Sequence, residues 1–216
     1  MTIRTVLFDV DGTLVDSNYL HIDAWQRAFA ELGAPVDAWR IHRALGRDSG
    51  QLLRAVAGEH DDDWNDRARA LHARHLRELA PRLRAFDGAA DLLRGVAGRG
   101  VRVVLASSAA EGELAMLRRA LGAEDAVHAS TSADDVDEAK PDPGILEVAL
   151  GRADATAGEA LVVGDSVWDM TAAARAHIRS VGVLCGGVGA GELTDAGAQE
   201  VFDGPAALLG ALDRLL

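Results

Sequence analysis

Short apolar runs alternate with amphipathic segments along most of this chain, and polar residues directly follow most of the runs. The runs are rich in Val and Leu and cover residues 5–8, 101–106, 160–164 and 180–184. Between and after them, apolar residues recur at helical spacing over residues 114–121, 145–150 and 206–215. Continuous apolar strands that alternate with helices are typical of a sheet that is buried on both faces. We therefore expect an α/β protein with a doubly wound parallel-sheet, Rossmann-like core.

Residues 16–85 interrupt this alternation, because they contain helical patterns and no convincing strand. Apolar residues follow helical spacing over residues 20–32, 41–56 and 64–79. The division predicts a catalytic core formed by residues 1–15 and 86–216, with a small α-helical cap domain at residues 16–85. Because the cap is inserted directly after the first strand, we expect it to cover the active site as a lid. The aromatic residues expected in the core of the cap are Trp25, Phe29 and Trp39.

The composition of the chain excludes several classes of partner. Its 216 residues include 22 basic and 34 acidic ones, and the formal net charge of −12 disfavours nucleic acid and anionic membranes as partners. No apolar run approaches the roughly 18 residues that a membrane span requires. Cys185 is the only cysteine, so no internal disulfide can form, and we expect a cytoplasmic protein. No heptad pattern or apolar surface patch stands out, so we expect a monomer or a weak homodimer.

Carboxylates and a hydroxyl follow the predicted strands at the points where the strands end. Asp9 and Asp11 follow the first strand, Ser107 the second and Asp165 the third. A lone Asp-x-Asp at a strand end is usually a capped turn. Because the carboxyl ends of parallel strands share one edge of a sheet, we expect these groups to meet there. Together with an ammonium group, they are the parts that phosphoryl transfer requires.

The side-chain ammonium can come only from Lys140, because the other 21 basic residues are arginines. A single lysine before a proline is ordinarily a solvated loop residue, and the acidic residues between positions 134 and 138 offer it partners. Arginine, however, serves the surface roles throughout this chain. Only a site with little space distinguishes the compact ammonium of lysine from the planar guanidinium of arginine. We therefore expect Lys140 in the active site.

Four motifs together resemble those of the haloacid dehalogenase-like hydrolase superfamily, and they occur in the order of that family over nearly the whole chain. The motifs are Asp9-Val10-Asp11-Gly12-Thr13, then Ser107 after an apolar strand, then Lys140-Pro141-Asp142-Pro143, and last Gly164-Asp165-Ser166-Val167-Trp168-Asp169. The helical insert resembles that of the branch that contains phosphoglycolate phosphatases and β-phosphoglucomutases.

This resemblance implies a role for each matching residue. Asp9 would attack phosphorus and form an aspartyl-phosphate, while Asp11 would protonate the leaving oxygen and later take a proton from water. Phosphoryl oxygens and substrate would be held by Ser107 and Lys140, with help from Thr13 in the first loop and from the backbone N–H of Ser108. Mg²⁺ would be bound by Asp9, the backbone carbonyl of Asp11 and Asp165, with Asp169 acting through a water or a neighbouring group.

The charges of these groups support their gathering around a divalent cation. Carboxylates that crowd together in a partly desolvated cleft repel one another. With Asp11 protonated, as an acid must be, the charge of −3 on the other three carboxylates is balanced by +2 from Mg²⁺ and +1 from Lys140. An acidic protein can then bind a phosphate ester, and without the metal it should reject one.

We therefore expect an Mg²⁺-dependent phosphatase that acts on a small phosphorylated metabolite. A sugar-phosphate mutase of the β-phosphoglucomutase type is the nearest alternative, although Thr13 resembles the hydrolytic members. A non-enzymatic phosphate-binding regulatory protein is a second alternative, which the complete set of catalytic groups disfavours. A haloacid dehalogenase is disfavoured by Asp11, since a leaving halide needs no acid.

The cap and the last glycine-rich segment give weaker signals. Arg47 lies where related caps carry a substrate-facing loop, and it either binds a second anionic or hydroxyl group of the substrate or stays on the surface. His72 and His75 have a spacing that is compatible with a metal pair, but no carboxylate partner is evident, and we expect a solvated helix face. Residues 186–191 lack the Lys and Ser/Thr of a P-loop and predict a flexible loop near the site.

Overall fold

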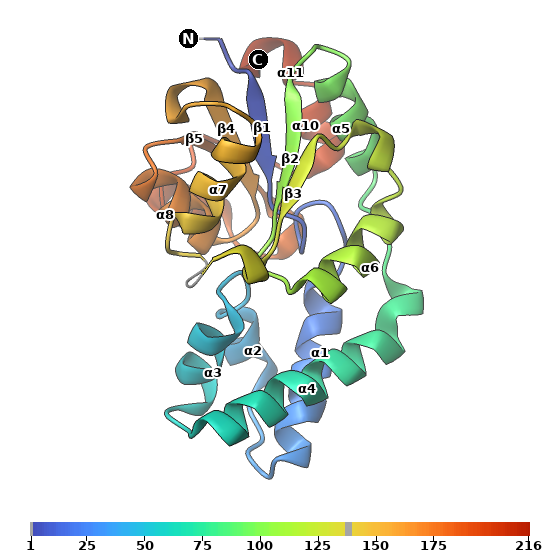
Figure 1. Cartoon of the computed structure of the whole chain (residues 1–216), viewed down its shortest axis with the longest axis vertical. Coiled ribbons are helices and arrows are strands. Elements are labelled where there is room, and N and C mark those ends of the chain that lie inside the picture. The colour runs from blue at the N-terminus through green and yellow to red at the C-terminus, as the bar shows by residue number, and fades with distance from the viewer. Residues whose placement is uncertain (1, 137–139) are drawn as a thin grey trace.

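The computed structural model describes residues 2–136 and 140–216 and contains a parallel sheet flanked by helices, with a smaller helical unit at one end (Figure 1). The strands are β1 (Thr5–Phe8), β2 (Arg102–Ala106), β3 (Ala129–Thr131), β4 (Ala160–Gly164), β5 (Arg179–Val183) and β6 (Glu200–Phe202). The α-helices are α1 (Asn18–Glu31), α2 (Ala38–His42), α3 (Ser49–Ala57), α4 (Asp62–Leu79), α5 (Ala89–Ala97), α6 (Glu111–Leu121), α7 (Gly144–Arg152), α8 (Val167–Arg175), α9 (Ala190–Asp195), α10 (Pro205–Leu209) and α11 (Leu212–Leu215). None of the helices in the described ranges has both the length and the apolar character needed to cross a membrane.

The strands of the sheet pair in parallel, in the order β3-β2-β1-β4-β5-β6. Thr5 of β1 lies opposite Arg102 of β2 on one side and Ala160 of β4 on the other. The chain extends from β1 to β3 in one direction and from β4 to β6 in the other, so the strand order reverses beside β1. Ligands of open parallel sheets bind at such a reversal, at the carboxyl ends of the strands. The predicted doubly wound α/β core is confirmed.

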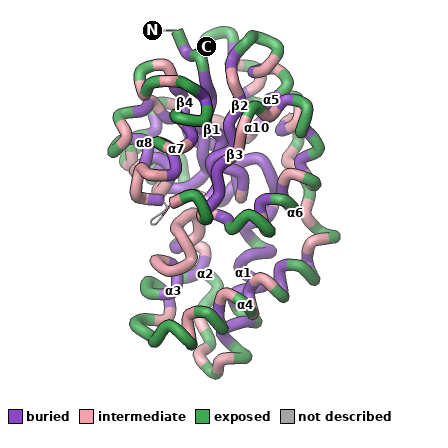
Figure 2. Tube along the Cα trace, in the orientation of Figure 1, coloured by how far each residue is buried: buried purple, intermediate pink, exposed green. Residues whose placement is uncertain are grey.

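Successive residues of each central strand point to opposite faces of the sheet and enter different apolar cores. In β1, Val6 and Phe8 pack on the face that is covered by α5, α6, α10 and α11, whereas Leu7 packs on the face that is covered by α7 and α8. Figure 2 shows the central strands as buried segments between partly exposed helices. Because both faces are covered, the strands form continuous apolar runs in the sequence rather than alternating ones.

The short and interrupted elements differ from the sequence-based prediction. Strands β3 and β6 were not predicted, because three residues each are too few to form a recognisable pattern. The single helix predicted over residues 206–215 is divided into α10 and α11, with Gly210 and Ala211 between them. The pattern over residues 41–56 contains parts of α2 and α3 on either side of Gly46, whose φ of +88° no α-helix accommodates.

Helices α1 to α4 form the unit that lies beyond the carboxyl edge of the sheet in Figure 1, and this unit has an apolar core of its own. Trp25 and Phe29 of α1 lie in that core as predicted, with ring centroids 5.5 Å apart. The prediction that Trp39 also lies there is wrong. Its side chain is 67% exposed, because α2 turns Ile41 inward instead. The polypeptide passes between the two units beside Val15 and Ala85, which form an antiparallel bridge.

Candidate active site

Three neighbouring strands deliver the predicted site residues to one edge of the sheet. Asp9 follows β1, Ser107 follows β2 and Asp165 follows β4. The backbone N–H of Asp9 donates to the carbonyl oxygen of Val163 at 2.9 Å, so the hydrogen bonding of the sheet continues to the first residue of the site. The chain then turns at Gly12 (φ +76°), where a Cβ would overlap the side chain of Asp165. The strand order thus brings together carboxylates that are far apart in the sequence.

Lys140 lies at the centre of the buried charges. Its Nζ lies 2.6 Å from Oδ1 of Asp9 and 2.8 Å from Oδ1 of Asp169, and it donates to the carbonyl oxygen of Ala106 at 2.7 Å. The side chain is only 1% exposed, so the alternative of a solvated loop lysine is wrong. Burial disfavours the charged amine, but the negative charges of Asp169 and Asp9 outweigh this effect and raise the pKa of Lys140. Part of the acidic stretch considered as an alternative partner, residues 137–139, lies outside the described residues.

Two polar side chains hold Asp165 from the first loop and from α1. Oγ1 of Thr13 lies 3.0 Å from Oδ2 of Asp9 and 2.9 Å from Oδ1 of Asp165, so this hydroxyl joins the two carboxylates. Nδ2 of Asn18 donates to Oδ2 of Asp165 at 3.0 Å and to the carbonyl oxygen of Gly186 at 3.1 Å. Thr13, predicted to assist substrate binding, is fully buried and orients the carboxylates in this structure.

Asp169 is fixed by the start of helix α8. The backbone N–H and the hydroxyl of Ser166 lie 3.0 Å and 2.6 Å from Oδ2 of Asp169, and the Asp169 N–H donates back to the Ser166 hydroxyl. This reciprocal capping box satisfies the first N–H groups of the helix. The other oxygen, Oδ1, is buried beside Lys140 and makes no well-aligned hydrogen bond. Asp169 therefore uses Oδ2 to cap the helix and directs Oδ1 toward Nζ of Lys140.

The residues at this edge fit a small, oxygen-coordinated cation. Ligand atoms of Asp9, Asp165 and Asp169 lie within 4.8 Å of one another, and all three side chains are buried. Burial raises the pKa of Asp9 to about 7, although Lys140 opposes the shift. Burial and the charges of Asp9 and Asp169 raise the pKa of Asp165 well above its usual range. A divalent cation would relieve this repulsion, and carboxylate oxygens are the ligands that Mg²⁺ prefers.

Asp11 pairs with groups of the first loop and α1 rather than with the three clustered carboxylates. Its Oδ1 accepts hydrogen bonds from Oγ of Ser17 at 2.5 Å and from Nε2 of His21 at 3.0 Å. Burial alone would raise the pKa of Asp11, but the charge and hydrogen bond of His21, with the hydrogen bond of Ser17, lower it. Asp11 is thus held as a carboxylate in this structure. The charge balance in the sequence analysis assumed that Asp11 is protonated, and this assumption does not hold here.

Asn18 and His21 are site residues that the sequence analysis missed. They are three residues apart on α1, so they lie on the same side of the helix, among apolar residues that are also buried. The sequence did contain one indication of their role, because two polar residues share an otherwise apolar helix face directly after an Asp-x-Asp turn.

A cavity of about 310 Å³ lies between the carboxylates and the cap. Its lining includes Asp9, Asp11, His21, Arg47 and Ser108. Ser107 and Thr13 are fully buried and do not belong to this lining, and Oγ of Ser107 accepts a hydrogen bond from the backbone N–H of Ala109 at 3.1 Å. A cavity of this size fits a small metabolite.

Arg47 lies on the cap side of this cavity. Its guanidinium carbon is 3.7 Å from the ring centroid of Trp168, which is a cation–π contact with the core. Its Nε is buried and finds no hydrogen-bond partner among the described residues. The adjoining cap loop is fixed to the core by Ser108, whose hydroxyl donates to the carbonyl oxygen of Gly46 at 3.3 Å. Arg47 therefore reaches the site, and Ser108 joins the cap to the core.

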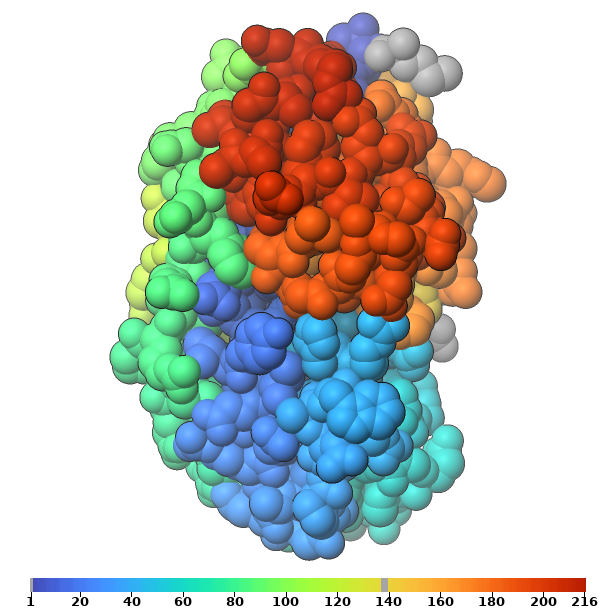
Figure 3. All heavy atoms as spheres, turned by 180° about the vertical axis from the view of Figure 1, so that it is seen from behind, coloured from blue at the N-terminus to red at the C-terminus, as the bar shows by residue number. Residues whose placement is uncertain are grey.

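On the opposite side of the molecule, the cap contacts the C-terminal part of the core (Figure 3). Nε2 of His42 lies 3.1 Å from the carbonyl oxygen of Gly186, and Arg43 forms an ion pair with Glu192. A Cβ at Gly186 would overlap the carboxylate of Asp165, so the main chain of this segment packs directly against the site. The segment over residues 186–191 thus lies near the site, as predicted, but it is not a loop throughout, because helix α9 begins at Ala190.

The prediction of a solvated face for His72 and His75 is wrong, because both side chains are buried and both have carboxylate partners. Nε2 of His75 lies 2.6 Å from Glu31, and Nδ1 of His72 lies 3.4 Å from Glu113. The two histidines do not form a metal pair, since each one contacts a carboxylate from a different helix. Spacing along one helix cannot reveal such partners.

Comparison with known proteins agrees with this geometry. The family profile of haloacid dehalogenase-like hydrolases matches residues 3–177. The phosphoglycolate phosphatase of Rhodospirillum rubrum is 34% identical, over 95% of this chain and 89% of that protein. The pyrophosphatase PpaX of Listeria monocytogenes is 27% identical, over 84% of this chain and 83% of that protein. Among solved structures, a hydrolase from Pseudomonas syringae has a TM-score of 0.94 at 34% identity, covering 100% of this chain and 99% of that one. A β-phosphoglucomutase from Clostridium difficile, 20% identical, shares the fold with a TM-score of 0.83, covering 94% and 92%.

A Rossmann-like sheet with three carboxylates and a buried lysine gathered beside its carboxyl edge fits an enzyme that acts on phosphate esters. The family match covers most of the sequence, and the chain belongs to the haloacid dehalogenase-like hydrolases. Within that family it is a phosphatase. The predicted family and activity are confirmed.

Proposed function

We propose that this phosphatase hydrolyses the monoester of a small phosphorylated metabolite through an aspartyl-phosphate on Asp9, with Mg²⁺ as its cofactor. The observation that carries the proposal is the buried contact of 2.6 Å between Nζ of Lys140 and Oδ1 of Asp9. A carboxylate that lies beside a fixed positive charge and a cation site can approach an anionic phosphoryl group without prohibitive repulsion.

The chemistry requires two steps at phosphorus. In the first step, an oxygen of Asp9 bonds to phosphorus as the ester P–O bond breaks, and Asp11 passes a proton to the leaving oxygen. Because Asp11 is a carboxylate in this structure, that proton comes from Nε2 of His21, which lies 3.0 Å from Oδ1 of Asp11. In the second step, water attacks phosphorus and gives its proton to Asp11, and the Asp9 carboxylate and inorganic phosphate are released. Lys140 and Ser107 would hold the phosphoryl oxygens, and Nζ of Lys140 donates to the carbonyl oxygen of Ala106, the residue before Ser107.

Asp9, Asp165 and the backbone carbonyl of Asp11 would hold Mg²⁺, and Asp169 would act on the cation through water or a neighbouring group. When bound, the cation supplies positive charge to the phosphoryl oxygens. Thr13 and Asn18 fix the orientation of Asp165, so the protein's own hydrogen bonds prepare this carboxylate.

Arg47 would bind a second polar or anionic group of the substrate. Its Nε is buried without a partner, and Arg47 lines the same cavity as Asp9. A cavity of about 310 Å³ limits the substrate to a small molecule. Phosphoglycolate and pyrophosphate, which appear in the names of the two relatives, are therefore the first compounds to test.

Phosphate release from purified protein tests this proposal. The panel should contain phosphoglycolate, pyrophosphate, sugar phosphates and polyol phosphates, each with Mg²⁺ and with EDTA, and Asp9→Asn should serve as the inactive control. We expect Mg²⁺-dependent release from at least one monoester. Absence of release from every compound would contradict the hydrolase, and ³¹P NMR that shows one sugar phosphate converted to another would identify a mutase instead.

A further inference from the structure

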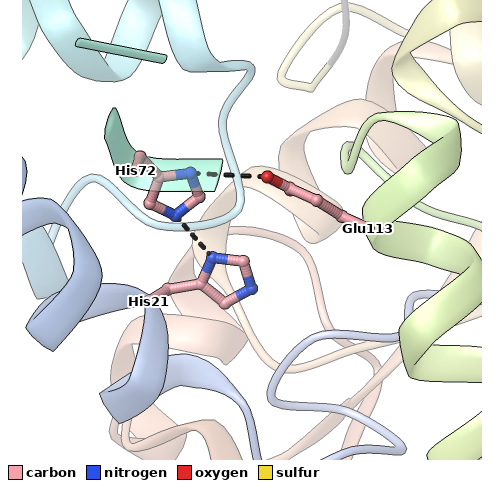
Figure 4. A group of neighbouring side chains, drawn as sticks. All are labelled: His21, His72 and Glu113. Atoms are coloured by element: carbon pink, nitrogen blue, oxygen red, sulfur yellow. Dashed lines mark hydrogen bonds and ion pairs between the residues drawn. The ribbon is translucent and has the colours of Figure 1, made fainter. Parts of the chain in front are cut away.

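A series of polar contacts leads from Asp11 into the cap and back to the core. Nε2 of His21 lies 3.0 Å from Oδ1 of Asp11, and Nδ1 of the same ring lies 3.1 Å from Nε2 of His72. Nδ1 of His72 then lies 3.4 Å from Oε1 of Glu113, as Figure 4 shows. The two histidines come from helices α1 and α4 of the cap, whereas Asp11 and Glu113 come from the core. We call these four residues the Asp11–Glu113 chain.

The two carboxylates at its ends determine where the hydrogens lie. Because a carboxylate accepts hydrogen bonds, Nε2 of His21 and Nδ1 of His72 each carry a hydrogen. Burial lowers the pKa of His72, and Glu113 offsets this only in part, so the ring is neutral and its Nε2 is an acceptor. Nδ1 of His21 therefore donates to His72, so His21 carries hydrogen on both nitrogens and is positively charged. In agreement, and against the effect of burial, Asp11 raises the pKa of His21. Each ring is held in one protonation state and one orientation by the partner beyond it.

By distance alone, His21, His72 and Glu113 could also hold a metal ion, since their ligand atoms lie within 4.8 Å of one another. Metal binding requires lone pairs that converge on one point. Here the ring of His72 lies between its neighbours, with Glu113 beside one nitrogen and His21 beside the other (Figure 4). One ring offers a metal only one of its nitrogens, so the geometry favours a hydrogen-bonded series over a metal centre.

Packing fixes the plane of the central ring. Trp25 stacks on His72 with ring centroids 4.1 Å apart and an interplanar angle of 14°. The ring of His21 meets the edge of the His72 ring in nearly the same plane, with centroids 5.2 Å apart and an interplanar angle of 21°. The side chains of His21 and His72 are 9% and 6% exposed, so water does not compete freely for their nitrogens. The series is therefore ordered by both stacking and hydrogen bonding.

We propose that His72 and Glu113 are positioning residues that act on Asp11 through His21. This inference rests on the proposed function, in which Asp11 transfers protons. Glu113 selects the nitrogen of His72 that carries hydrogen, and His72 then holds His21 with Nε2 directed at Asp11. Because two members belong to the cap and two to the core, the Asp11–Glu113 chain is complete only when the cap lies against the core as it does here. The position of the cap against the core is thereby linked to the orientation of the Asp11 carboxylate.

His72→Phe tests the proposal, because phenylalanine keeps the stack on Trp25 and removes both nitrogens. We expect kcat for an alkyl phosphate to fall about 10- to 100-fold, with KM changed by less than about threefold, since proton transfer typically contributes 10²- to 10⁴-fold to a rate. The matched control is His75→Phe, which removes an equally buried histidine one turn further along the same helix. It should change kcat by less than about threefold.

A comparison of substrates with different leaving groups distinguishes a loss of Asp11 positioning from a general disturbance of the active site. Single-turnover release of the leaving group measures the first step alone. With p-nitrophenyl phosphate, whose leaving group needs little protonation, the loss in His72→Phe should shrink to less than about threefold. Equal losses with the alkyl and aryl esters in a variant of wild-type thermal stability would overturn the inference.

Glu113 provides an independent series should His72→Phe fold poorly. Glu113→Ala should lower kcat for the alkyl ester, and Glu113→Gln should recover part of the loss because its amide oxygen still accepts from Nδ1 of His72. Glu111→Ala, an exposed position on the same helix, is the control. If the wild-type enzyme releases no phosphate from any compound, the proposed function fails. If the wild type is active but the Glu113 and His72 variants match their controls, only the Asp11–Glu113 chain is refuted.

Discussion

Nζ of Lys140 lies 2.6 Å from Oδ1 of Asp9, and both side chains are buried at the carboxyl edge of the sheet. A second carboxylate, Asp169, lies 2.8 Å from the same ammonium group, and a third, Asp165, is joined to Asp9 through Thr13. The nucleophile is therefore partly neutralised by the protein, and an excess of negative charge remains for a cation to balance. Reactivity, metal binding and stability all depend on this group of charges.

Asp9→Asn should abolish turnover while leaving the fold intact. The amide keeps the shape of the side chain but cannot form a phosphoryl bond, so kcat should fall by on the order of 10⁴-fold or more. Steady-state phosphate release measures the loss, and circular dichroism checks the fold. Retention of more than about a hundredth of the activity would contradict Asp9 as the nucleophile.

Lys140→Arg should lose much of the rate even though it keeps the charge. The side chain of Lys140 is only 1% exposed, so the surroundings of Nζ leave no room for a larger group. A planar guanidinium therefore cannot replace the compact ammonium there. Lys140→Met should in addition lower the free energy of unfolding of the metal-free protein by about 3–5 kcal/mol, because it leaves buried carboxylates without their counter-charge. Chemical denaturation measures this change. An Arg variant with wild-type kcat would show that the site does not discriminate between the two cations.

The metal-free protein should become less stable as the pH rises from about 5 to about 8. The folded state raises the pKa of Asp9 to about 7 and also raises that of Asp165, so it binds more protons in this range than the unfolded state. Stability present at low pH is then lost as the pH rises through the folded pKa values. Thermal melts in EDTA should show this fall, and added Mg²⁺ should raise the Tm more at pH 8 than at pH 5.5. Asp165→Asn should reduce both effects, and a melting temperature independent of pH in EDTA would contradict the repulsion among these carboxylates.

Gly186→Ala should weaken metal binding. The added Cβ would overlap the carboxylate of Asp165, so that side chain must rotate away from its hydrogen bond with Asn18. We expect the concentration of Mg²⁺ that gives half-maximal activity to rise about 10- to 100-fold, as for other disturbances of groups that orient metal ligands. Gly191→Ala is the matched control, because a Cβ there meets no atom within 4 Å. Equal Mg²⁺ titrations for the two variants would place the cation away from Asp165.

Arg47→Gln should raise KM for substrates that carry a second anionic group, with a smaller effect on kcat. A hydrogen bond to a charged group contributes about 1.5–3 kcal/mol, so KM should rise at least about tenfold. Arg54→Gln, an exposed position on the neighbouring helix α3, should leave KM unchanged. A substrate without the second anionic group should show no difference between the variants. If KM for every substrate is unaffected, Arg47 is a structural cation that packs on Trp168.

Several features of this protein were determined by the sequence alone. Continuous apolar runs predicted a parallel sheet, and because the carboxyl ends of its strands share one edge, Asp9 and Asp165 were expected on the same edge. The bias of 21 arginines against one lysine marked Lys140, which the structure places within 2.6 Å of Asp9. These inferences hold because they depend on strand direction and residue chemistry, which a linear pattern indicates, whereas the pairing of β1 with β4 was revealed by the structure.

The tertiary structure decided which helix faces meet. His21 and His72 lie 51 positions apart, and their contact depends on how α1 packs against α4, which no periodicity along either helix specifies. That packing also buries His72, whereas the orientation of α2 turns Trp39 outward, and the start of α1 sets His21 against Asp11 rather than leaving Asp11 protonated. Hydrogen bonds and pKa values depend on distances of about 3 Å between side chains, whereas a hydrophobic pattern specifies only which face of each helix is buried.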